Sequence, residues 1–199
     1  VVEIVEEEAE EDLFQIAGVR QDDLNISILR TTKSRFAWLL INLGTALLAS
    51  AVIGQFDATI EAVVALAVLM PIVASMGGNA GTQTLAIAVR ALATKDLTTS
   101  NALRQVSKEL VVGTINGIAF AVLIGLATLL WFQDPVLGGV IAAAMVINMI
   151  VAGLAGILIP LGLDRAGVDP AISSAVFLTT ITDIVGFFAF LGLGAWLLL

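Results

Sequence analysis

The sequence predicts an all-α integral membrane protein with five membrane-spanning helices. Its 199 residues are 59% hydrophobic and 13% charged, whereas soluble domains average about 45–50% and about 25%. The mean hydropathy is +1.04. A soluble domain of this size has no core that could bury so much apolar surface, so the class of soluble globular proteins is excluded.

Five long apolar segments supply the predicted spans. Each exceeds the roughly 20 residues that cross a ~30 Å hydrocarbon layer at ~1.5 Å per residue. The segments cover residues 36–56, 62–92, 110–132, 136–163 and 171–199.

The distribution of charge predicts the orientation of these spans. The connections after the first and third segments contain Asp57, Glu61 and Asp134 and no basic residue. All nine Lys and Arg residues lie in the N-terminal segment or around the connections after the second and fourth segments. By the positive-inside rule, the N-terminus lies in the cytoplasm and the C-terminus outside, in the inner (plasma) membrane of the cell.

The residues before the first span form an acidic segment. Nine of the 17 acidic residues lie within residues 3–23, so the net charge of −8 describes this segment more than the membrane part. An acidic segment repels phosphate groups, which argues against nucleic acid as a partner. The sequence starts at Val1 inside what looks like an ordered element, and we expect it to be a fragment of a longer protein.

The sequence has no His, Cys or Tyr, which excludes several kinds of site. Zinc and soft-metal sites, disulfides, and thiol or Ser-His-Asp catalysis all need residues that the chain lacks. We therefore expect no enzymatic activity. Any bound metal must be held by oxygen atoms, which favours hard ions such as Mg²⁺ or Ca²⁺.

One acidic residue, Asp183, lies deep inside a predicted span, where an Asp costs about 2.5–3.5 kcal/mol. It either packs against another helix in a protonated or hydrogen-bonded form, or it binds a cation beside a water-filled path. The second interpretation is favoured because uncompensated charges inside a membrane mark ion pathways. Thr179 and Thr180 share its helix face and offer neutral oxygens to an ion, unless they and Thr182 bond to the preceding turn.

The second segment contains several helix-breaking residues: Pro71, Gly77, Gly78 and Gly81. They permit a kink or an unwound stretch beside a cavity, or else the Gly77–Gly81 pair forms a small-residue contact with another helix. Spacing alone leaves both interpretations open. Four polar residues within six positions favour a polar path: Asn79, Thr82, Gln83 and Thr84.

Small and polar residues in the other spans predict contacts between helices. Asn42, Asn116 and Asn148 are expected to form interhelical hydrogen bonds. Gly113 and Gly117 are expected to let two helices approach closely.

Two motifs give the chain a family resemblance. PIVASMGGNAGTQ in the second span and TTITDIVGF in the last span resemble the membrane domain of MgtE-type magnesium transporters. The acidic lead-in VVEIVEEEAEEDLFQIAGV resembles the last element of the CBS sensor domain that precedes the pore in bacterial members. The resemblance therefore divides the chain into a sensor remnant (1–18), a connecting juxtamembrane helix (19–35) and a five-helix pore domain (36–199).

The resemblance implies a homodimer with a pore at the subunit interface. Asp183 matches the family's pore aspartate, facing its copy across the axis as the ligand of hydrated Mg²⁺. The implied pore lining comes from the second and fifth spans: Gly77, Gly78, Asn79, Gly81, Thr82, Gln83, Thr179 and Thr180. Thr82 departs from the family pattern, where Asn is frequent, and Ala86 lies where a hydroxyl residue can occur. The resemblance also implies a cytosolic regulatory domain of the same protein as a partner of the pore, and we expect most of it to be missing from this sequence.

The expected function is channel-like transport of Mg²⁺ through this pore, with Mg²⁺ as both transported ion and ligand. Other divalent cations are further candidate substrates. One alternative is a carrier that couples Mg²⁺ movement to H⁺ or Na⁺ exchange, and another is a membrane scaffold that transports nothing. An intramembrane aspartyl protease is disfavoured because it needs two aspartates in one site, and only Asp183 lies deep in a span.

Overall fold

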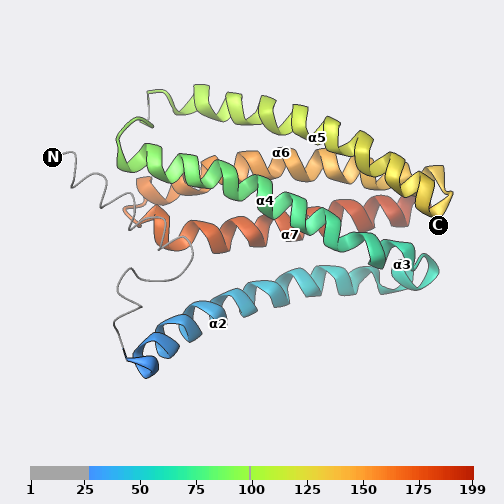
Figure 1. The fold of residues 1–199 in the computed structure, drawn as a ribbon, viewed down its shortest axis with the longest axis horizontal. Helices are drawn as coiled ribbons and strands as arrows, with labels where there is room; N and C mark the ends of the chain where they lie inside the picture. Colours follow the sequence, from blue (N-terminus) through green and yellow to red (C-terminus); the bar gives the residue numbers. More distant parts are fainter. Residues whose placement is uncertain (1–26, 99) are drawn as a thin grey trace.

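The computed structural model describes residues 27–98 and 100–199, and within them the protein is a bundle of long helices (Figure 1). A 3-10 turn, η2 (Gly54–Phe56), and a short helix, α3 (Asp57–Ala62), join the first two long helices. The five long helices are α2 (Ile28–Ile53), α4 (Ala65–Ala93), α5 (Ala102–Phe132), α6 (Pro135–Arg165) and α7 (Pro170–Leu197).

These five helices confirm the five predicted spans, because each contains a stretch long and apolar enough to cross a membrane. The predicted sensor remnant, residues 1–18, lies outside the described residues, as does the first part of the connecting helix predicted over 19–35. The rest of that connecting helix is continuous with the first span, since α2 runs without a break from Ile28 to Ile53.

The second span is helical throughout. α4 continues from Ala65 to Ala93 through Pro71 and all three glycines, so the unwound stretch that the sequence permitted is not observed. Pro71 lies within the second turn of α4, where its missing N–H leaves only the Ala67 carbonyl without the usual i+4 donor. Small residues in α4 therefore act through close contacts rather than through an interruption of the helix.

α6 is the central helix of the bundle. It packs on α4, α5 and α7. In an apolar 18-residue stretch of α6, 61% is buried, whereas only 6% of the corresponding stretch of the first span, Ile28–Ala62, is buried. Its N-terminus is well defined, because Asp134 accepts hydrogen bonds from the backbone N–H groups of Val136 and Leu137 and Pro135 opens the first turn. α2 lies at the edge of the bundle and packs chiefly on α7 (Figure 1).

Glycines allow the close approach of α6 to its neighbours. A Cβ on Gly113 of α5 would lie 2.8 Å from the Met149 carbonyl oxygen, and one on Gly117 would lie 3.1 Å from the Val146 Cα. Both distances are shorter than ordinary side-chain contacts, so the predicted helix contacts at these two glycines are confirmed. Backbone-to-backbone contact of this kind maximises dispersion between helices, which replaces the hydrophobic effect inside a membrane.

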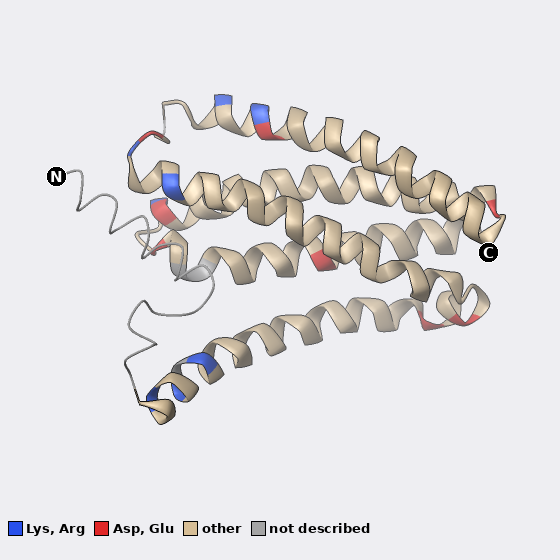
Figure 2. Ribbon diagram, viewed as in Figure 1, with Lys and Arg blue, Asp and Glu red and all other residues tan. Residues whose placement is uncertain are grey.

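The basic side chains of the described residues lie at one end of the bundle. Figure 2 shows the Lys and Arg residues of the described part gathered at the end where α2 and α5 begin. Asp57, Glu61 and Asp134 lie at the opposite end, in or beside the connections α2–α4 and α5–α6. Among the described residues, one end of the bundle therefore carries all the basic side chains together with some carboxylates such as Asp96 and Asp164, and the opposite end carries carboxylates alone.

Replacing Gly156 tests the contact between α6 and α4. A Cβ at Gly156 would lie 2.7 Å from the Gly81 carbonyl oxygen, so Gly156→Val is expected to destabilise the fold by about 1–3 kcal/mol through overpacking. Thermal unfolding in detergent, followed by circular dichroism, should show a melting temperature lower by about 2–10 °C. Gly162→Val is the control, because nothing lies within 4 Å of a Cβ there. Equal melting temperatures for both variants would contradict the contact.

Candidate cation site

A buried amide joins the two helices that carry the predicted site. Asn148 of α6 has no exposed surface, and its Nδ2 donates a hydrogen bond to the Val73 carbonyl oxygen of α4 at 2.8 Å. The amide sits between Gly77 of α4 and Gly186 of α7, and a Cβ on either glycine would overlap it. The interhelical hydrogen bond predicted for Asn148 is confirmed, and the residue determines the separation of α4 and α7 at this level.

The two glycines of the Gly77–Gly81 pair point into the protomer. Gly77 contacts Asn148, and a Cβ on Gly81 would lie 2.7 Å from the Leu178 side chain of α7. Both residues are buried. Their contacts in the protomer are those of a small-residue face, and a role for them in lining a path stays a prediction.

A second face of α4 is polar and points away from the rest of the bundle. Nothing lies within 4 Å of a Cβ on Gly78, and Asn79 and Thr82 are exposed. Asn79 donates a hydrogen bond to the Ser75 hydroxyl at 3.3 Å, and Thr82 donates to the Gly78 carbonyl oxygen at 2.8 Å. Since these bonds stay within α4, the remaining oxygen lone pairs of this face are free for water or an ion.

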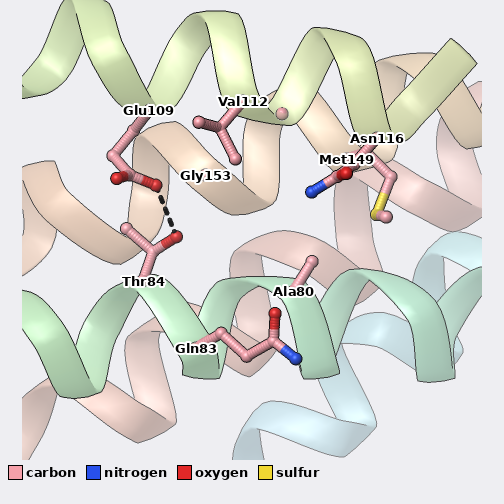
Figure 3. Close-up of a pocket in the computed structure, with 9 residues that line it drawn as sticks. Ala80, Gln83, Thr84, Glu109, Val112, Asn116, Met149 and Gly153 are labelled. Carbon is pink, nitrogen blue, oxygen red and sulfur yellow. Dashed lines mark hydrogen bonds between the residues drawn. The ribbon is translucent and has the colours of Figure 1, made fainter.

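Gln83 follows Asn79 by four residues, so it lies on the same side of α4 and is likewise exposed. It borders a small pocket with α5 and α6 that also contains Thr84 and Glu109 (Figure 3). The sequence grouped Gln83 with Asn79 and Thr82 because they are neighbours in one motif. A helix turns by about 100° per residue, so Gln83 points away from Thr82 although the two are adjacent in sequence.

Asp183 has no hydrogen-bond or ion-pair partner in the part of the chain that the structure describes. Its side chain is half-buried on α7. Thr179 and Thr180, on the same face, both donate to the Val176 carbonyl oxygen, and Thr182 donates to the Leu178 carbonyl oxygen. All three threonines therefore bond to the preceding turn, which leaves their oxygen atoms as acceptors only and the Asp183 carboxylate uncompensated.

The interhelical hydrogen bonds predicted for the other two asparagines are wrong. Asn42 donates to the Trp38 carbonyl oxygen of its own helix at 3.0 Å. Asn116 is exposed on α5 and borders the same pocket as Gln83, with no interhelical hydrogen bond. Position within a span does not tell which side of the helix a residue occupies, and in the described part of the chain neither side chain forms a hydrogen bond to another helix.

The chemistry available in one protomer is that of an oxygen site with few charges. Among the described residues there is no group of three or more His, Cys, Asp or Glu side chains that could hold a metal ion. Around Asp183 one carboxylate and several neutral oxygens are available, and hard cations bind to ligands of this kind. The rest of a coordination shell has to come from water or from a second protein chain.

The family model described as "Divalent cation transporter", MgtE, matches residues 70–193, a range that contains both the glycine-rich motif and Asp183. The chain belongs to the MgtE family. The resemblance inferred from the two motifs is thereby confirmed, and the chain is a multi-pass membrane protein. MgtE proteins are transporters rather than enzymes, in agreement with the expectation from the sequence.

Three curated relatives agree with the family model, and each is called "Magnesium transporter MgtE". The protein of Enterococcus faecalis is 34% identical over 92% of this chain, and that of Bacillus subtilis is 30% identical over 97%. The protein of Thermus thermophilus is 33% identical over 100% of the chain. The alignments cover 41%, 43% and 44% of these relatives, so the chain spans less than half of their length.

Asn148→Ala tests the buried amide. The variant loses the hydrogen bond to Val73 and leaves a gap between two glycines, so the free energy of unfolding should fall by about 1–3 kcal/mol. Thermal unfolding of the purified chain measures this change. Asn42→Ala, which removes an amide bonded only to its own helix, should change the free energy by less than about 0.5 kcal/mol. A larger loss in the Asn42 variant than in the Asn148 variant would refute the assignment.

Proposed function

We propose that this chain is the membrane part of a Mg²⁺ transporter and that the ion passes along the outward face of α4 and the Asp183 face of α7. The names of the three relatives support Mg²⁺ as the transported ion. The single observation that carries the location is the half-buried carboxylate of Asp183, in mid-span and without a partner among the described residues. A carboxylate in this position costs several kcal/mol unless a cation or water compensates it.

The polar face of α4 supports a path outside the single protomer. Exposed Asn79 and Thr82 would be poorly solvated by lipid chains, which cannot form hydrogen bonds. A second copy of the chain that covers this face would enclose a polar passage between two protomers. We therefore propose a homodimer with the pore at its interface.

Two copies of Asp183 would suit a hydrated dication. Mg²⁺ loses its water reluctantly and is commonly held by one or two carboxylates with several waters retained. Two carboxylates carry a charge of −2 and balance one Mg²⁺, while threonine and asparagine oxygens accept hydrogen bonds from its waters. Permeation of the hydrated ion through such a site is channel-like, with the basic end of the bundle on the cytoplasmic side.

Asp183→Asn tests the central ligand. Loss of the negative charge should lower Mg²⁺ uptake into liposomes at least tenfold, because a neutral amide no longer balances the dication. Helix content and elution volume should match those of the unmodified chain. Glu61→Gln, which removes an exposed carboxylate in α3, should transport at the normal rate. Normal uptake by the Asp183 variant would rule out the proposed site.

Gly78→Leu tests the location of the passage. A Cβ at this position meets no atom within 4 Å, so the fold should persist while the leucine side chain obstructs a path along this face. Flux should fall severalfold or more, measured with a Mg²⁺-sensitive dye inside liposomes. Gly139→Leu adds the same side chain at an equally open position of α6 and should conduct normally. Equal flux in both variants would show that the ion does not pass Gly78.

A gradient experiment separates channel-like permeation from a coupled carrier. In liposomes without a Mg²⁺ electrochemical gradient, an imposed H⁺ or Na⁺ gradient should drive no net Mg²⁺ movement. Flux should instead follow the Mg²⁺ gradient and the membrane potential alone. Uphill Mg²⁺ movement driven by either gradient would replace the channel-like mechanism with a coupled one.

A further inference from the structure

The pocket beside Gln83 is a second polar feature of the bundle, separate from Asp183. It is a pocket of about 40 Å³ between three helices, and it is open to the surface where Gln83 and Asn116 are exposed. The side chains that give it its polar character are Gln83 and Thr84 from α4 and Glu109 and Asn116 from α5, while α6 closes it with Met149 and Gly153 (Figure 3). The pocket contains no residue of α7, so the ion path proposed above does not account for it.

Glu109 is the only charged residue that lines this pocket. Its Oε2 accepts a hydrogen bond from the Thr84 hydroxyl at 2.9 Å, and the carboxylate is half-buried. No Lys or Arg lines the pocket. Since one neutral hydroxyl donor compensates only a small part of the charge of a half-buried carboxylate, the site favours a cation.

The donor atoms of the pocket are those of a hard-cation site. Glu109 contributes a carboxylate, Thr84 a hydroxyl, and Gln83 and Asn116 amide oxygens. Oxygen ligands of this kind bind alkali and alkaline-earth cations, whereas soft metals prefer sulfur and imidazole nitrogen.

Charge and size distinguish a monovalent from a divalent ion. A monovalent cation neutralises the single carboxylate, whereas a dication would leave a net charge of +1 among three apolar helices. A cavity of about 40 Å³ also has room for about three water-sized spheres. Mg²⁺ usually keeps several of its waters, and a hydrated dication would extend beyond the pocket through its open side.

We propose that the pocket between α4, α5 and α6 binds one Na⁺ ion, with Glu109 as its charged ligand. The bound ion joins α4 to α5. These two helices otherwise contact each other little, because each packs mainly on α6. The ion would therefore stabilise the position of α4 from the side opposite to α7. The assignment concerns binding alone and does not depend on the proposed Mg²⁺ path.

Binding of radioactive Na⁺ to the purified full chain, in choline chloride at constant ionic strength, tests this site. The unmodified chain should bind Na⁺ saturably, and its melting temperature should rise when NaCl replaces choline chloride. Glu109→Gln keeps the shape of the side chain and removes its charge, and it should weaken Na⁺ binding at least tenfold. Glu61→Gln removes an exposed carboxylate of α3, outside both the pocket and the proposed Mg²⁺ path, and should bind Na⁺ as the unmodified chain does.

Three results would overturn the proposal. These are equal Na⁺ binding by Glu109→Gln and the unmodified chain, the same melting temperature in NaCl and choline chloride, and displacement of Na⁺ by equimolar Mg²⁺. The last result would assign a divalent ion to the pocket. If Glu109→Gln fails to fold, Asn116→Leu at the exposed border of the pocket replaces it. That variant should weaken Na⁺ binding severalfold, and unchanged binding would refute the site.

Discussion

The close approach of α6 to the helices around it is the constraint on which the rest of the structure depends. Glycine pairs bring its backbone against α5 and α4, and the Asn148 amide fills the remaining space between α4 and α7. Inside a membrane, helix association depends on such contacts, because lipid chains are as apolar as the side chains they replace. With α6 in the centre, the two helices that carry the glycine-rich motif and Asp183 are held at a defined separation.

The same constraint explains how the glycine-rich motif can serve two purposes. Gly77 and Gly81 pack inward against Asn148 and Leu178, while Gly78 and Thr82 remain on the outward face. Successive residues of one continuous helix thus supply both the contact that positions α4 and the polar surface assigned to the ion. A substitution in this motif affects either stability or permeation, depending on which face it alters.

Much of this arrangement could be predicted from the sequence, since span length and charge segregation are local properties. The five spans and the isolated Asp183 follow from hydropathy alone. The faces of the helices do not, because the spans are apolar on all sides and their periodicity is weak. For that reason Asn42 and Asn116 were wrongly assigned to interhelical bonds. The pocket at Glu109 does not follow from the sequence, because Thr84 and Glu109 are 25 positions apart and meet only when α4 and α5 flank α6.

The marginal attachment of α2 has a mechanical consequence. Only 6% of an apolar 18-residue stretch in the span Ile28–Ala62 is buried, and the principal contact of α2 within the bundle is with α7. Tilting α2 therefore disturbs few contacts. Tilting α4 or α5 would break the close contacts that glycines allow between these helices and α6. A displacement applied to the chain before Ile28 would reach the helix that carries Asp183 first and leave the α4–α5–α6 unit in place.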